Sequence, residues 1–467
     1  MLRSVAPLIA AALVLPLAGP ARAAPYDDGL SSPVEDSYYP AKGDPGIDTL
    51  HYDLELTWLR RARVLRGDAR ITFRAVTDDN SFPLDLSPAM RVRRVEVGGN
   101  RVPYTHTGKN LVVDMPVAED SRYTTRVVYR GTPEPAAGPA SRSDIARLGM
   151  RVTKDGQLWT MQEPFGAFTW YPANDQPSDK ALYDVRIDAP GDWVGVSTGE
   201  MTKRRKAGSR TITEWTNEHP MSSYLMTMAL GPYRLRKQTG PRGLPLTYWV
   251  PRDRPHLVTP LLRTPSALRW LKSRLGPYPF DRAGVVVTPS DSAMETQTMI
   301  TFGAKNYRYG TRDVRQTMVH ELAHSWYGNS VTPSDWRDLW MNEGMATYLD
   351  TRWAVDQGWS TWRRSQRYWK WDDPWLRRTY GPPGAYKRGE FGSSNVYDCT
   401  ALMWDRLRLR LGNAEFDRLV RQWPQQHRDT NQSRESYVDW AEAFTGENLG
   451  RFFEKWLTSR KSPTRKR

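Results

Sequence analysis

The spacing of hydrophobic residues changes near the middle of this 467-residue chain, and this change restricts the possible fold more than any other feature. Up to about residue 233, short segments such as 52–58 and 69–73 alternate apolar and polar residues, which is typical of β-strands with one buried face. Beyond that point, leucines three and four residues apart in 261–275 predict a helix that ends at Gly276. The sequence therefore predicts an α+β multidomain protein, with an antiparallel β domain followed by a mainly helical domain.

Local signals place the boundaries of these parts. Gly98-Gly99-Asn100 follows an alternating segment and predicts a hairpin turn. The apolar run 284–287 predicts a buried strand inside the second domain. We expect a signal peptide at 1–23, a Pro/Gly/Asp-rich linker at 24–48, the β domain at 49–237, the catalytic domain at 238–460 and a basic tail at 461–467.

The N-terminus has the pattern of a secretory signal peptide. Arg3 precedes an apolar run at 5–17, and Ala21-Arg22-Ala23 fits a cleavage site before Ala24. A membrane anchor is the alternative, but the run is too short to span a bilayer and two prolines interrupt it. No later segment resembles a membrane span. We therefore expect a secreted, extracellular protein that is cleaved after Ala23.

Charge and cysteine content exclude some classes of protein. The formal net charge is +15, but the basic residues are dispersed and no nucleic-acid-binding motif accompanies them. Nucleic acid is therefore not an expected partner. Cys399 is the only cysteine, so no intrachain disulfide can form even though export would permit one. The sequence leaves the oligomeric state open, with a monomer favoured.

The segment 320–324 reads His-Glu-Leu-Ala-His within a helical pattern that we expect to stop at Gly328. Residues four apart lie on one face of a helix, so His320 and His324 can bind the same Zn²⁺ ion. Glu321 then lies beside the metal, where its carboxylate can accept a proton from a metal-activated water. This motif predicts a catalytic zinc site with Glu321 as its general base.

A third ligand is offered by Glu343, which is separated from His324 by eighteen residues and begins a second helical pattern. Two histidines and one glutamate leave the fourth tetrahedral position open, as a catalytic zinc ion requires. We therefore expect one Zn²⁺ ion held by His320, His324 and Glu343.

The zinc motif and its spacing resemble the signature of the aminopeptidase N family of zinc metallopeptidases. The resemblance covers roughly residues 49–463. Further segments resemble the family in order and spacing: QEP at 162–164, DQPSDKA at 175–181, PMSSYL at 220–225, LGPYPF at 275–280, SAMET at 292–296 and NVYD at 395–398.

The resemblance implies a thermolysin-like catalytic domain and a role for each of five further residues. Glu163 and Glu295 are expected to bind the α-ammonium group of a peptide substrate. The backbone of Ala293 and Met294 is expected to hold the peptide in an extended conformation. Tyr397 is expected to donate a hydrogen bond to the oxyanion of the tetrahedral intermediate.

The chain departs from the family pattern at several positions close to these residues. Ser292 and Thr296 stand where the family has glycine and asparagine, and Met161 stands where glutamine is frequent. Asp398-Cys399 follows Tyr397 in place of a basic residue and glycine. Tyr386 is a nearby alternative for the catalytic tyrosine.

Together these features predict zinc-dependent removal of amino-terminal residues from peptides outside the cell. One alternative is a thermolysin-like zinc endopeptidase, because the same zinc ligands serve both reactions. Another is a weakly active protein that binds peptides or polymers. The sequence does not indicate the preferred amino-terminal side chain or the physiological substrate.

Overall fold

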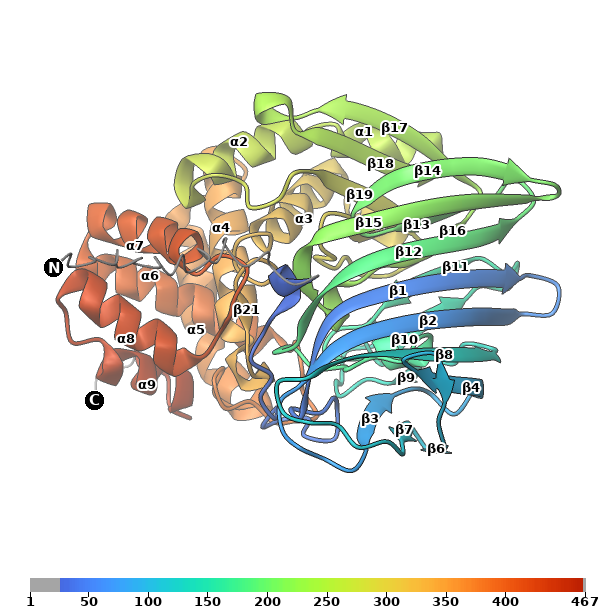
Figure 1. Cartoon of the computed structure of the whole chain (residues 1–467). Coiled ribbons are helices and arrows are strands. Elements are labelled where there is room, and N and C mark those ends of the chain that lie inside the picture. The colour runs from blue at the N-terminus through green and yellow to red at the C-terminus, as the bar shows by residue number, and fades with distance from the viewer. Residues whose placement is uncertain (1–25, 465–467) are drawn as a thin grey trace, which may run out of the picture.

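The computed structural model describes residues 26–464, so the predicted signal peptide and its cleavage site lie outside the described residues, as does the end of the basic tail. Within the described part, the strands of the first half lie beside a helical second half (Figure 1). No helix of residues 26–464 has the length and hydropathy needed to cross a membrane.

The larger sheet of the first half has eight strands within the described residues. In spatial order they are β14 (Glu200–Ala207), β15 (Arg210–Ser222), β12 (Lys180–Pro190), β1 (Ile47–Leu59), β2 (Val64–Ala75), β8 (Arg122–Gly131), β4 (Met90–Val97) and β5 (Asn100–Arg101). The predicted turn at Gly98-Gly99 is confirmed, because β4 and β5 pair through it and both glycines have positive φ.

Two smaller sheets complete the first half. One comprises β13 (Val194–Ser197), β16 (Met228–Gly231), β11 (Leu158–Met161), β10 (Arg147–Val152) and β9 (Ala136–Ala137). The other comprises β3 (Phe82–Asp85), β7 (Asn110–Val113) and β6 (Tyr104–Thr107).

The prediction of an antiparallel domain holds for these sheets except at one pair, since β1 and β12 run parallel. Adjacent strands that are consecutive in sequence are joined by tight turns, which force an antiparallel arrangement. β1 and β12 are separated by the intervening strands β2 to β11, and this long connection permits parallel pairing.

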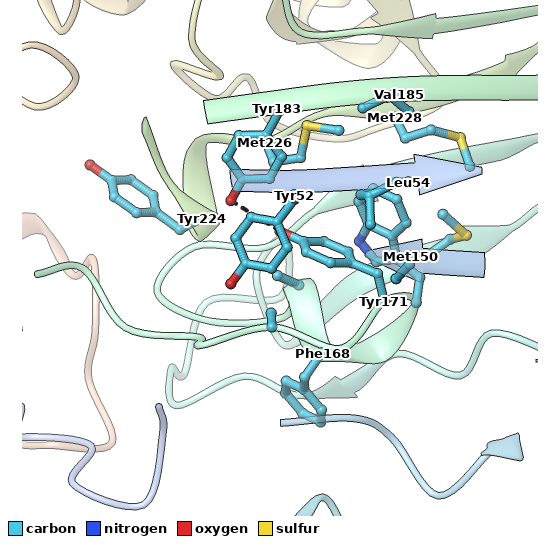
Figure 2. Close-up of a cluster of buried hydrophobic side chains, with 14 of the residues drawn as sticks. Tyr52, Leu54, Met150, Phe168, Tyr171, Tyr183, Val185, Tyr224, Met226 and Met228 are labelled. Carbon is cyan, nitrogen blue, oxygen red and sulfur yellow. Dashed lines mark hydrogen bonds between the residues drawn. The ribbon is translucent and has the colours of Figure 1, made fainter. Parts of the chain in front are cut away.

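The core of the first half lies between the eight-stranded and five-stranded sheets. Tyr52 of β1 stacks on Tyr183 of β12 with ring centroids 4.9 Å apart. Figure 2 shows both rings in a cluster that also contains Met150 of β10 and Met228 of β16. The predicted period-two pattern of β1 therefore places its alternate side chains in this core.

The second half combines a small sheet with nine helices among the described residues. Its sheet consists of β17 (Tyr233–Thr239), β18 (Pro245–Pro251), β19 (Ala283–Thr288) and β20 (Ile300–Gly303), with β21 (Thr332–Pro333) and β22 (Asn431–Gln432) paired separately. The helices are α1 (Val258–Leu261), α2 (Thr264–Leu275), α3 (Thr311–Ala323), α4 (Trp340–Asp356), α5 (Trp362–Tyr380), α6 (Thr400–Leu411), α7 (Asn413–Gln426), α8 (Arg434–Thr445) and α9 (Gly450–Thr458).

Two boundaries can be compared with the sequence pattern. The helix predicted from the leucines of 261–275 ends where expected, since Gly276 caps α2 with a φ of 86°. Its start was wrong, because α1 ends at Leu261 and α2 begins only at Thr264. The helix carrying the zinc motif, α3, ends at Ala323 and not at Gly328. After Ala323 the backbone forms tighter turns, with Ser325 and Trp326 donating to carbonyls three residues earlier, which ends the regular α-helix.

The division into domains stays a prediction, but two contacts bear on it. β17 pairs with β18, so by sheet membership the second unit would begin at Tyr233. The described part of the predicted linker is held against the second half: the Asp36 carboxylate accepts a hydrogen bond from the backbone N–H of Trp336 at 2.6 Å, and Tyr38 donates to the carbonyl of Tyr386. This segment therefore packs along the helical half.

Candidate metal centre and active site

Helices α3 and α4 bring the three predicted zinc ligands together. His320 and His324 lie one turn apart at the end of α3, with ring centroids separated by 4.8 Å. Glu343 lies in the first turn of α4. Its Oε2 is 3.1 Å from His320 Nε2 and 3.5 Å from His324 Nε2. All three side chains therefore direct one donor atom toward a shared point.

Hydrogen bonds to the other ring nitrogens orient both imidazoles. His320 Nδ1 lies 2.8 Å from Asp350 Oδ2, and His324 Nδ1 lies 3.1 Å from the carbonyl oxygen of Tyr327. Because both partners are acceptors, each Nδ1 carries a proton, and Nε2 is the ring nitrogen that each histidine can offer to a metal. Two oriented imidazoles and one carboxylate fit the requirements of a catalytic Zn²⁺ ion.

The predicted general base, Glu321, lies in the same buried group. A carboxylate oxygen of Glu321 lies within 4.8 Å of ligand atoms of Glu295 and His324. Burial raises the pKa of Glu321 to about 8, although the two neighbouring histidines act in the opposite direction. Burial thus favours the neutral carboxyl group and the cationic neighbours favour the carboxylate, so Glu321 is positioned to exchange a proton.

Glu163 and Glu295, the residues expected to bind the α-ammonium group, lie beside the ligand set. Carboxylate oxygens of Glu163, Glu295 and Glu343 lie within 4.8 Å of one another. The Oε1 atoms of Glu163 and Glu295 are buried and have no hydrogen-bond partner among residues 26–464. Burial and mutual repulsion raise the pKa of Glu163, and burial raises that of Glu295. Such a pair favours a cationic partner that would neutralise it.

The backbone near Ala293 offers an unpaired edge. The N–H and C=O groups of Met294 pair with Thr301 on β20, at 2.8 and 3.1 Å. Ala293 has no hydrogen bond to its backbone groups among the described residues. Of the two residues expected to bind peptide backbone, Ala293 is thus the one with free backbone groups.

Tyr397 contacts the ligand set through Glu343. It lies in a π-helical turn at Asn395–Cys399, a conformation frequent at functional sites. Its hydroxyl donates to Glu343 Oε1 at 3.0 Å. The alternative, Tyr386, is buried and donates to the carbonyl of Trp336 at 2.8 Å. Tyr397 therefore contributes its hydroxyl to the site, whereas Tyr386 packs in the core.

One cavity of about 460 Å³ is lined by all of the predicted site residues, namely Glu163, Ala293, Met294, Glu295, His320, Glu321, His324, Glu343 and Tyr397. Met161 and Ser292, two of the departures from the family pattern, lie in its wall. Thr296 is buried behind it, where its hydroxyl contacts the Met299 carbonyl and the Thr301 hydroxyl. Cys399 is also buried, and its thiol is directed at the Asp373 carbonyl. Thr296 and Cys399 therefore pack inside the protein and do not line the cavity.

Two residues at the site were not predicted from the sequence. Asp350 follows Glu343 by seven residues, which is two helical turns, so the i+7 spacing on α4 could have indicated it. Arg142 belongs to the segment between β9 and β10 and donates to the Tyr397 hydroxyl at 3.1 Å. No local motif marks Arg142, because its partner Tyr397 lies 255 positions further along the chain.

Comparison with known proteins gives matches over both halves. Residues 48–225 match the Peptidase M1 N-terminal domain and residues 262–378 match the Peptidase family M1 domain. Human glutamyl aminopeptidase is 28% identical over 328 residues, covering 65% of this chain and 34% of the relative. Leukotriene A-4 hydrolase of Xenopus laevis is 28% identical over 323 residues, covering 66% and 51%. The chain thus spans about a third of the length of glutamyl aminopeptidase.

Solved structures match this chain over nearly the whole described fold. The M1 zinc metallopeptidase of Deinococcus radiodurans superposes with a TM-score of 0.82 at 28% identity, covering 92% of this chain and 98% of the other. A mutant of that enzyme has been solved with the substrate Tyr-Ser-Ala. Legionella pneumophila aminopeptidase A, at 18% identity and a TM-score of 0.76, shares the fold. The matches in both halves and the shared architecture show that this chain belongs to peptidase family M1.

Proposed function

We propose that this protein is a zinc-dependent aminopeptidase that removes amino-terminal residues from peptides outside the cell. One observation carries the proposal: a set of zinc ligands and two unpartnered carboxylates share a single cavity. The zinc ligands support hydrolysis, and the two carboxylates support selection of a free amino terminus. The relatives named as aminopeptidases and zinc metallopeptidases support the same activity.

His320, His324 and Glu343 would hold the ion. A Zn²⁺ ion in such a site polarises the scissile carbonyl and lowers the pKa of water. Glu321 takes the proton from the attacking water and later delivers it to the leaving nitrogen. The short distance between Glu321 and the ligand set, within 4.8 Å of His324, supports this role.

Tyr397 stabilises the charge that develops on the carbonyl oxygen. Its hydroxyl now donates to Glu343 Oε1, one oxygen of a metal ligand. A small rotation of the hydroxyl hydrogen would direct it to an oxyanion beside the ligand set. Burial and the negative charge of Glu343 raise the pKa of Tyr397, so the phenol keeps the proton that it donates.

Glu163 and Glu295 select the amino terminus. An α-ammonium group placed between them would supply the missing hydrogen-bond donors for both orphaned oxygens. The unpaired backbone groups of Ala293 would hold the adjoining peptide unit in an extended conformation. Fixing the ammonium group next to the ligand set places the first peptide bond at the metal.

A paired-substrate assay tests this proposal. An aminoacyl chromogenic amide and its N-acetylated form differ only in the charged amine, so we expect hydrolysis of the free amide to be about 100-fold faster or more. Equal rates would reject the aminopeptidase and favour the endopeptidase alternative. Absence of zinc and of turnover on both substrates would favour a binding protein.

The extracellular location rests on the predicted signal peptide. Expression of the full chain, followed by N-terminal sequencing of protein recovered outside the cell, tests it. We expect the mature chain to begin at Ala24. Recovery of an uncleaved chain inside the cell would contradict this part of the proposal.

A further inference from the structure

One face of helix α5 combines exposed aromatic rings with exposed basic side chains. We call it the aromatic-basic face, and it consists of Arg363, Arg364, Arg367, Tyr368, Lys370, Trp371, Trp375 and Arg378. Helix α5 is labelled among the helices of the second half in Figure 1.

The aromatic side chains of this face are unusually accessible. Trp371 is 78% exposed, Tyr368 is 51% exposed and Trp375 is 48% exposed. Eight large hydrophobic side chains are exposed among residues 26–464, and these three include both exposed tryptophans. Exposed apolar groups that cluster on one element mark an interaction surface more often than scattered ones.

The opposite face of α5 fixes the helix to the protein. Trp369 and Leu376 are buried in it, and the buried Arg377 pairs with Asp373 at 2.8 Å and donates to the Ser459 carbonyl. The spacing of 364, 368, 371, 375 and 378 places those residues along the outward side. The aromatic-basic face is therefore rigidly presented by a helix that is already packed.

The charges on this face are of one sign. None of its five basic side chains forms an ion pair within the described residues. Elsewhere the chain pairs many of its arginines; Arg126, for example, binds both Asp68 and Glu96. Two acidic residues lie between the exposed positions: Asp372 is half-buried, and Asp373 is buried and paired with Arg377. The face therefore suits a partner with dense negative charge.

We propose that the aromatic-basic face docks on the surface of an anionic lipid bilayer. Trp and Tyr side chains partition into the interface between lipid headgroups and acyl chains, and Arg and Lys side chains bind anionic headgroups. The outward side of one helix is convex, which lets the rings enter a bilayer but gives no groove to enclose a polymer. The proposal is independent of the catalytic activity.

Sedimentation with lipid vesicles tests the proposal. The probes are vesicles of phosphatidylcholine alone and of phosphatidylcholine with phosphatidylglycerol. We expect binding to the anionic vesicles only, weakened by added salt. The variants Trp371→Ser/Trp375→Ser and Arg364→Gln/Arg367→Gln/Lys370→Gln should each bind about tenfold more weakly or worse. Tyr368 is left unchanged because its hydroxyl contacts Asp398, next to Tyr397.

The matched control removes three charges elsewhere. Arg204, Arg205 and Lys206 are exposed on the edge strand β14, so their triple change to Gln lowers the net charge equally. We expect this control to bind the vesicles as the wild type does, and circular dichroism melting should show all variants folded. Equal loss in the control, or no binding to anionic vesicles, would overturn the proposal. Binding to a soluble polyanion such as dextran sulfate but not to vesicles would also overturn it.

A separate observation concerns Arg142, whose guanidinium group is fixed on several sides. Its Nη1 donates to the Gly392 carbonyl at 2.6 Å and to the Tyr397 hydroxyl at 3.1 Å. Its Nε and Nη2 donate to the Asp144 carboxylate at 3.1 and 2.6 Å. A guanidinium group can only donate hydrogen bonds, so the Tyr397 oxygen must accept from it. The Tyr397 hydrogen then points away from Arg142, toward the zinc ligands.

We infer that Arg142 is a positioning residue that orients the Tyr397 hydroxyl toward the oxyanion. This inference rests on the proposed function. We expect Arg142→Gln to lower kcat about tenfold with little change in KM, and Arg142→Lys to recover part of that loss. In a Tyr397→Phe background, Arg142→Gln should have less than about a twofold further effect.

The control is Ser141→Ala, which removes a contact between the same segment and Glu390 without touching Tyr397. We expect its kcat to match the wild type. Turnover of the free aminoacyl amide by the wild type establishes the proposed function first, and a wild type without turnover would refute that function. With an active wild type, additive effects of the Arg142 and Tyr397 changes, or an equal loss in Ser141→Ala, would overturn the inference.

Discussion

At the scale of single residues, the zinc site extends beyond the residues that the motif names. Asp350 fixes His320 through Nδ1, and the Tyr327 carbonyl fixes His324 in the same way. These contacts decide which ring nitrogen is free for a metal. The affinity of the site therefore depends on residues that do not touch the ion.

Replacement of Asp350 tests this dependence. We expect Asp350→Ala to bind zinc about 10- to 100-fold more weakly, because His320 loses its orienting acceptor. Competition with a chromogenic chelator measures the affinity. Asp356→Ala is the control, since Asp356 lies on the same helix but pairs with Arg274 at the surface. Equal affinity of the two variants would show that Asp350 does not support the site.

Replacement of Glu321 separates catalysis from metal binding. We expect Glu321→Gln to keep its zinc and to lose about 10³-fold in kcat, because the amide cannot accept the proton of the attacking water. Metal analysis and turnover of an aminoacyl amide give the two readouts. Activity close to that of the wild type would exclude Glu321 as the base.

At the scale of elements, several strands and helices could be predicted because their apolar side chains repeat at the period of the structure. The alternating pattern of β1 and the leucine spacing of α2 are examples. The helices α3 and α4, which carry His320 and Glu343, are two more. The end of α3 was missed because the turns after Ala323 keep a helical apolar pattern while the hydrogen bonds change. The parallel pairing of β1 with β12 was missed because strand order depends on long-range contacts.

The residues of the candidate site also differ in whether local sequence could predict them. His320, Glu321, His324 and Glu343 could be predicted from local spacing, and Glu163, Glu295 and Tyr397 only from the family resemblance. Arg142 could be predicted from neither, since its role arises where the β half meets the helical half.

The segment that precedes β1 provides a test at this scale. The Asp36 carboxylate accepts hydrogen bonds from the backbone N–H groups of Trp336, Tyr38 and Tyr39. We expect Asp36→Ala to destabilise the fold by about 1–3 kcal/mol, because three N–H groups lose their acceptor. Urea denaturation measures the free energy of unfolding. The exposed neighbour variant Glu35→Ala should have no effect, and similar losses in both would reject this role.

At the scale of the whole molecule, a buried lysine joins the two halves. Lys180 of β12 donates through Nζ to the carbonyls of Asn329 and Ser330, at 3.0 and 2.9 Å. Burial lowers the pKa of Lys180 to about 7, although Asp429 acts in the opposite direction. A neutral amine still has two N–H donors for these two carbonyls.

This lysine makes stability depend on pH. Between pH 7 and 10.5 the unfolded chain binds the Lys180 proton and the folded chain does not, so stability rises with pH in that window. We expect a contribution of about 1.4 kcal/mol per pH unit. Urea denaturation of the wild type and of Lys180→Met from pH 7 to pH 9 measures this contribution of Lys180 to the free energy of unfolding. Parallel pH profiles for the two proteins would show that Lys180 stays charged in the fold.

The proposed aminopeptidase activity depends on the whole cavity acting as one unit, with the proposed amine-binding carboxylates Glu163 and Glu295 beside the zinc ligands. Mass spectrometry of the products formed from an unmodified linear peptide tests it most directly. We predict a ladder in which residues are lost one at a time from the amino terminus, and no cleavage when that terminus is acetylated. Internal fragments from both peptides would contradict the assignment.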